Sequence, residues 1–138
     1  MYNWHMADIQ HYTVLAADDE RSSLLVLFRI LSPEFTLLTA KTGGDAIICA
    51  RGDTPDLILL DIVLPDMGGL DVLRELKGCP DTCDIPVILV SGNDGGEYEA
   101  SGFGLGAVDY IVKPFSAERL LASVRAHIAA DGCLGDKC

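Results

Sequence analysis

The chain has 138 residues, 49% of them hydrophobic, and its formal net charge at pH 7 is −11. This length suits a single domain with one core, and the hydrophobic fraction is ample for burial. The negative charge argues against direct binding of nucleic acid or an anionic membrane, since both repel an acidic surface, but it is compatible with cations and basic partner surfaces.

Strand patterns and helix patterns alternate five times along the chain. Short apolar runs bounded by turn residues predict strands, and longer amphipathic segments predict helices. The predicted strands are residues 13–17, 35–40, 57–60, 86–90 and 107–112, and the predicted helices are 22–31, 44–51, 70–77, 95–104 and 116–130, the last capped by Ser116. Strands separated by helices in this way imply parallel βαβ units, and therefore a three-layer α/β sandwich.

The same patterns divide the chain into one domain and two flanks. Residues 12–130 form the predicted domain, residues 1–11 are an unpatterned N-terminal extension, and residues 131–138 are a flexible tail or the start of a linker. No segment reaches the length of a membrane span, and the odd number of cysteines, five, argues against a fully paired disulfide framework. We therefore expect a cytoplasmic protein with free thiols.

Residues 55–69, with the sequence PDLILLDIVLPDMGG, form the central motif. The run 57–60 predicts a strand buried on both faces, which places Asp61 where that strand ends. Ligands bind at this carboxyl end of the strands in open α/β sheets. Taken alone, an aspartate at a strand end is more often a helix cap or a turn residue than a reactive group.

Other strand ends supply further polar side chains to the same edge of the sheet. The first strand ends in Asp18 and Asp19, the fourth in Ser91, and the fifth runs through Tyr110 to Lys113. Clustered carboxylates repel one another, and a divalent cation such as Mg²⁺ removes that repulsion. An aspartate can also act as a nucleophile in phosphoryl transfer, with Mg²⁺, a lysine and a hydroxyl neutralising the charge on phosphorus oxygens.

This ordered set resembles the receiver domains of two-component response regulators. The matching pieces are Asp18 and Asp19 after the first strand, Asp61 in DIVLPDMGG, Ser91 in VSG, and Lys113 in YIVKPF. The resemblance covers residues 12–128 and implies the flavodoxin-like doubly wound sheet, with five parallel strands in the order 2-1-3-4-5 and five helices. More weakly, the runs AVDYIVKPF at residues 107–115 and SVRAHI at residues 123–128 resemble receivers fused to enzymes of cyclic-di-GMP metabolism.

The resemblance implies a role for each matching residue. Asp61 accepts a phosphoryl group from a histidine kinase or a phosphotransfer protein, and Lys113 pairs with that group. Mg²⁺, for which Mn²⁺ or Ca²⁺ could substitute, is bound by Asp19, Asp61 and the backbone carbonyl of Val63, with Asp18 acting mainly through water. The peptide bond between Lys113 and Pro114 is expected to be cis.

The resemblance also implies a conformational switch. Ser91 moves toward the phosphoryl group, and Tyr110 turns inward behind it. The change is expected on the face formed by the fourth helix, the fifth strand and the fifth helix, where it would control an output domain, a downstream partner or a phosphorylation-dependent homodimer. Such a protein is a signalling switch with weak autophosphatase activity rather than an enzyme with turnover.

Two other classes of function remain open from the residues alone. A phosphatase of the haloacid dehalogenase class also uses an aspartate at a strand end, but it needs a second aspartate where this chain has Val63. A flavodoxin needs a Ser/Thr-rich phosphate loop after the first strand, where this chain has Asp18, Asp19 and Glu20. Each candidate site residue also has an ordinary interpretation as a cap, turn or surface residue, but all of these would have to coincide at one edge.

Overall fold

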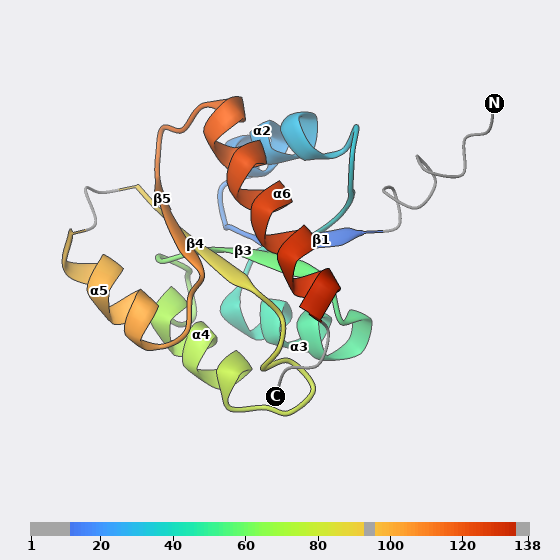
Figure 1. Ribbon diagram of the computed structural model, residues 1–138. Helices are drawn as coiled ribbons and strands as arrows, with labels where there is room; N and C mark the ends of the chain where they lie inside the picture. The colour runs from blue at the N-terminus through green and yellow to red at the C-terminus, as the bar shows by residue number, and fades with distance from the viewer. Residues whose placement is uncertain (1–11, 93–95, 135–138) are drawn as a thin grey trace.

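The computed structural model describes residues 12–92 and 96–134, and it shows a parallel sheet between two layers of helices (Figure 1). The strands are β1 (Thr13–Ala17), β2 (Thr36–Ala40), β3 (Leu57–Asp61), β4 (Val87–Ser91) and β5 (Asp109–Val112). All pairs are parallel, and the order across the sheet is β2-β1-β3-β4-β5. The predicted fold class and strand order are confirmed.

Helices cover both faces of the sheet. The described elements on one face are α2 (Arg21–Leu31) and α6 (Ala117–Leu134), and those on the other are α3 (Gly43–Asp53), α4 (Gly69–Lys77) and α5 (Gly96–Gly104) (Figure 1). The arrangement is therefore the predicted three-layer sandwich.

The sheet separates two hydrophobic clusters, because successive strand residues point to opposite faces. In β3, Leu57 and Leu59 belong to the cluster that includes residues of α2 and α6. Ile58 and Leu60 belong to the cluster that includes residues of α3 and α4. β3 and β4 are buried along their whole length, which explains why both strands read as continuous apolar runs in the sequence.

The register of the strands brings their carboxyl ends to one level. Ala17 at the end of β1 pairs with Leu60, Asp61 at the end of β3 pairs with Val90, and Ser91 pairs with Val112. Residues that follow these strands therefore meet at one edge of the sheet, although they are far apart in the chain.

The helix boundaries agree closely with the sequence interpretation except at the C-terminal end. Ser116 precedes α6, and its Oγ accepts a hydrogen bond from the backbone N–H of Arg119 at 2.9 Å, as expected for an N-cap. The helix then continues to Leu134 rather than ending at Ala130. The predicted N-terminal extension, residues 1–11, and the last four residues, 135–138, lie outside the part that the structure describes.

Two further features concern the cysteines and the length of the helices. Cys49, Cys79 and Cys83 are half-buried thiols. Among the described helices, none combines the length and the apolar character needed to cross a membrane.

Candidate functional site

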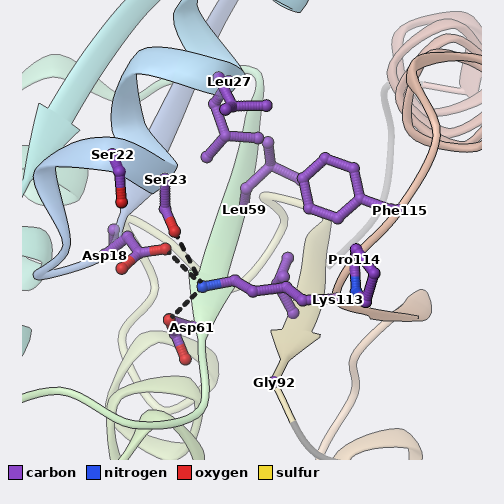
Figure 2. A pocket seen from close by; sticks show the side chains of 13 residues that line it. Asp18, Ser22, Ser23, Leu27, Leu59, Asp61, Gly92, Lys113, Pro114 and Phe115 are labelled. Atoms are coloured by element: carbon purple, nitrogen blue, oxygen red, sulfur yellow. Dashed lines mark hydrogen bonds and ion pairs between the residues drawn. The ribbon is translucent and has the colours of Figure 1, made fainter.

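Lys113 follows β5 directly and reaches two buried carboxylates at the carboxyl edge of the sheet (Figure 2). Its Nζ lies 2.9 Å from Oδ2 of Asp18 and 3.0 Å from Oδ2 of Asp61. These partners stand 95 and 52 positions away in the chain. The fold therefore gathers three of the predicted site residues from the ends of β1, β3 and β5.

The site holds more negative than positive charge. Asp18 and Asp61 are 2% and 7% exposed, and both share the one ammonium group of Lys113. Burial raises the pKa of Asp61 above its usual value, and the bonds from Val63 and Lys113 offset this only in part, while the charge of Asp18 raises it further. Burial lowers the pKa of Lys113, but its bonds to the two carboxylates outweigh burial and raise it overall.

The loop after β3 fixes the carboxylate of Asp61. The backbone N–H of Val63 donates to Oδ1 of Asp61 at 2.9 Å, and the N–H of Gly69 donates to the carbonyl of Ile62 at 2.6 Å. A side chain at Gly69 would overlap the carbonyl oxygen of Asp61, so only glycine allows α4 to begin this close to the end of β3. One oxygen of Asp61 is thus held by the loop and the other by Lys113.

The side chains of Asp18 and Asp19 have different surroundings. Oδ2 of Asp18 faces Lys113, while its Oδ1 accepts a hydrogen bond from the backbone N–H of Glu20 at 3.0 Å, so Asp18 also shapes the turn into α2. The side chain of Asp19 is exposed. The structure therefore brings Asp18 rather than Asp19 into the cluster with Asp61.

Two polar residues that the sequence interpretation assigned no role also face Lys113. Ser23 Oγ lies 3.3 Å from Nζ of Lys113, and it donates to Oε1 of Glu20 at 3.1 Å. Oε1 of Glu20 is itself 3.8 Å from Nζ. The sequence contains a signal that could have placed Ser23 at this site, because Ser23 falls in the first turn of the helix that follows the first strand, at the same edge of the sheet.

The donor groups at this edge fit a hard cation in part. Asp18 and Asp61 supply carboxylate oxygens, and Mg²⁺ typically takes one or two carboxylates and completes its shell with waters. Across residues 12–92 and 96–134, however, no three acidic, histidine or cysteine side chains gather closely enough to hold a metal. A site that uses Asp19 as well would require its carboxylate to turn inward.

The predicted switch residues are both buried. Ser91 is 3% exposed at the end of β4, and its backbone carbonyl accepts a hydrogen bond from the N–H of Lys113 at 2.7 Å. Tyr110 is 6% exposed and belongs to the hydrophobic cluster beneath α3 and α4, with no partner for its hydroxyl among the described residues. Tyr110 thus already occupies an inward position here. The Lys113–Pro114 peptide bond is cis, as the resemblance implied.

A second charged cluster lies where β5 meets α6. Oδ2 of Asp109 accepts hydrogen bonds from Oγ of Ser123 at 2.5 Å and from Nη1 of Arg119 at 3.1 Å. Arg119 also donates to the backbone carbonyl of Tyr110 at 3.2 Å, and the N–H of Tyr110 donates to Oδ1 of Asp109 at 2.7 Å. This cluster, formed by Asp109, Arg119 and Ser123, is called the β5–α6 cluster below.

The chain belongs to the response regulator receiver domain family, because the model of that family matches residues 14–125, most of its length. This confirms the receiver interpretation over the phosphatase and the flavodoxin. A crystal structure of a CheY-like response regulator receiver domain protein from Methanospirillum hungatei is similar, with a TM-score of 0.82 and 25% identity, and the match covers 88% of this chain and 96% of that one.

Two relatives illustrate the larger proteins that carry similar segments. A probable cyclic di-GMP phosphodiesterase from Vibrio cholerae is 36% identical over 128 residues, which are 93% of this chain and 29% of that protein. The probable transcriptional regulatory protein TcrX from Mycobacterium tuberculosis is 39% identical over 127 residues, which are 91% of this chain and 53% of that protein. The chain thus spans about half, or less, of these relatives.

Proposed function

We propose that this chain is a phosphorylatable receiver in which Asp61 accepts a phosphoryl group from a histidine kinase or a phosphotransfer protein. The observation that carries the proposal is the pair of carboxylates, Asp18 and Asp61, held 2.9 and 3.0 Å from one lysine at the sheet edge. Membership of the receiver family supports it.

The proposed chemistry follows from the position of each group. A carboxylate oxygen of Asp61 attacks the phosphorus atom, and Lys113, already within hydrogen-bond distance of that carboxylate, pairs with the incoming phosphoryl oxygens. The Ser91 hydroxyl, at the end of the adjacent strand β4, is the proposed second donor. When bound, Mg²⁺ would be held by Asp19, Asp61 and the carbonyl of Val63, with Asp18 acting through water, and would neutralise charge on the phosphoryl oxygens.

The product of this reaction is a regulatory state rather than a released molecule. The two relatives described above differ in the activity that their names give, yet both align with more than nine tenths of this chain. This supports a shared controlling role for the domain. We propose that the chain acts in the cytoplasm on an output domain or a partner protein, with homodimerisation as one form of output, and that it has only weak autophosphatase activity.

Signal transmission is proposed to run through α5, β5 and α6. Ser91 ends β4 and Lys113 follows β5, so both border this face, and Tyr110 lies on β5 opposite Leu89. A phosphoryl group on Asp61 carries about −1.5 to −2 charges in place of the −1 of the carboxylate, and a Ser91 hydroxyl drawn toward it leaves space near Tyr110. Amide exchange with and without beryllofluoride should change at residues 98–112. Changes confined to residues around Asp61 would contradict this route.

The deciding experiment is labelling of the chain with acetyl phosphate and Mg²⁺, followed by intact-protein and peptide mass spectrometry. The wild-type chain should gain one phosphoryl group on Asp61, and Asp61→Asn should gain none. Asp71→Asn is the matched control, since this exposed carboxylate pairs with Arg74 at the start of α4 rather than with Lys113. Labelling of Asp61→Asn at the wild-type level would refute the assignment.

A further inference from the structure

An apolar cavity opens directly beside the pair formed by Asp61 and Lys113. Its volume is about 460 Å³, within the range of roughly 300–1,000 Å³ that is typical of small-molecule sites. Its apolar walls come from α2, from β3 and β4, and from the loop after β5, and they are Val26, Leu27, Leu59, Val90, Pro114 and Phe115. Figure 2 shows Leu27, Leu59 and Phe115 grouped beside the stem of Lys113.

The cavity is charged at one end only. Asp18, Asp61 and Lys113 line that end, and the two carboxylates hold the ammonium group of Lys113 in place. In Figure 2 this ammonium group points away from the apolar side chains and toward the carboxylates. A ligand that suits the whole cavity therefore combines a polar head, placed at Lys113 and Asp61, with an apolar body directly attached to it.

We infer that this cavity binds the acyl chain of small acyl phosphates, and that the chain accepts phosphoryl groups faster from donors with longer apolar chains. The inference rests on the proposed function, because the phosphoryl head must sit at Asp61. The proposed function selects the head of this occupant, because a phosphoryl group that reacts with Asp61 lies beside the ammonium group of Lys113. The cavity selects the body, because its apolar walls begin beside that lysine.

The transfer step balances without another reactant. A carboxylate oxygen of Asp61 forms a bond to phosphorus, and the bond between phosphorus and the acyl oxygen breaks. The electron pair leaves with the carboxylate product, so no proton, oxidant or reductant is required. The acyl chain does not react and contributes only through burial, which lowers the barrier relative to free donor and free protein.

The test compares acetyl, butanoyl and hexanoyl phosphate as donors to the full chain with Mg²⁺. The three leaving carboxylates have nearly the same basicity, so their intrinsic reactivity is matched. Burial of one methylene group is worth about fourfold. Because the cavity is open on one side, we expect the second-order rate of Asp61 labelling to rise roughly five- to tenfold from acetyl to butanoyl phosphate, and further with hexanoyl phosphate.

Two substitutions on α2 test whether a preference for longer acyl chains arises from the cavity. Val26 is 47% exposed and lines the cavity, whereas its neighbour Leu25 is 53% exposed and does not. Val26→Asn should bring the ratio of hexanoyl to acetyl rates close to one, and Leu25→Asn should leave the ratio at its wild-type value. A preference that survives Val26→Asn, or that both variants lose, would overturn the inference.

The outcomes separate this inference from the proposed function. Equal rates from all three donors would overturn the inference and leave Asp61 as the phosphoacceptor; this is also the result expected if only a side chain of a protein donor enters the cavity. Labelling of Asp61 by none of the donors would overturn both.

Discussion

Two aspartates in separate charged clusters, Asp61 at the carboxyl edge of the sheet and Asp109 at the start of β5, have different hydrogen-bonding partners. Asp61 is held by one backbone N–H and by a lysine that it shares with Asp18. Asp109 receives hydrogen bonds from Arg119, Ser123 and the N–H of Tyr110, with no second carboxylate in the β5–α6 cluster. Burial acts on both, yet the pKa of Asp61 is raised and that of Asp109 is lowered, because only at Asp109 do the hydrogen bonds outweigh burial.

This difference distinguishes a reactive carboxylate from a structural one. A carboxylate whose oxygens are fully occupied by donors is stabilised and is a poor nucleophile. A buried carboxylate that shares its cation still gains from a further positive charge. We therefore expect the two sites to respond differently to changes in charge.

Replacing the cationic residue of each site, Lys113 or Arg119, should give the largest difference in the free energy of unfolding between the two sites. Lys113→Met leaves two buried carboxylates without a cation, and breaking a buried pair costs about 3–5 kcal/mol. Because the Lys113 side chain is 20% exposed, we expect the low end, about 3 kcal/mol, in the free energy of unfolding measured by urea at pH 7 without metal. Arg119→Met, at a side chain 46% exposed, should cost roughly 0.5 kcal/mol. Equal losses of unfolding free energy in the two variants would show that the two sites do not differ in this way.

Addition of Mg²⁺ should stabilise the fold only through the Asp61 site. A cation that binds only the native state at about 100 times its Kd contributes roughly 2.7 kcal/mol. We expect a gain of that order in the wild-type chain and in Asp109→Asn, and almost none in Asp61→Asn, when thermal unfolding is followed over a Mg²⁺ titration. A gain that persists in Asp61→Asn would place the cation elsewhere.

Acid should affect the two aspartates with opposite signs. The lowered pKa of Asp109 means that its ionised form adds stability above the ordinary carboxyl pKa of 3.8, and this stability is lost as the pH falls through the folded value. The raised pKa of Asp61 means that its protonated form adds stability below 3.8, which is lost as the pH rises through the folded value.

Urea unfolding between about pH 6 and pH 3 measures this difference in metal-free buffer. The stability of wild type minus that of Asp109→Asn should fall by about 1 kcal/mol on acidification, the worth of a hydrogen bond. The stability of wild type minus that of Asp61→Asn should rise over the same range. Two curves of the same sign would show that the two carboxylates do not differ in the way inferred here.

Much of the fold and part of the site follow from local sequence patterns. The apolar runs of β3 and β4 are visible because both faces of these strands are buried. Asp61 and Lys113 could be placed together because the carboxyl ends of parallel strands share an edge. These predictions needed only the alternation of strands and helices, which the sequence displays directly.

The parts of the site that the sequence patterns do not predict depend on the direction of single side chains. Asp18 and Asp19 are adjacent, and neighbouring residues of extended backbone point opposite ways, so one turned inward and the other outward. Which of them would turn inward depends on the turn into α2. The predicted end of the last helix at Ala130 is also wrong, because α6 continues through Gly132 to Leu134, and a helix tolerates one glycine at a cost of about 1 kcal/mol.

The β5–α6 cluster also affects how copies of this protein can associate through the edge of the sheet. β5 is an edge strand of four residues, and its outer backbone groups are a template on which another strand could pair. At Tyr110 both groups are already occupied, the N–H by Asp109 and the carbonyl by Arg119. These hydrogen bonds therefore disfavour the pairing of another strand with the β5 edge of the sheet, and with it aggregation.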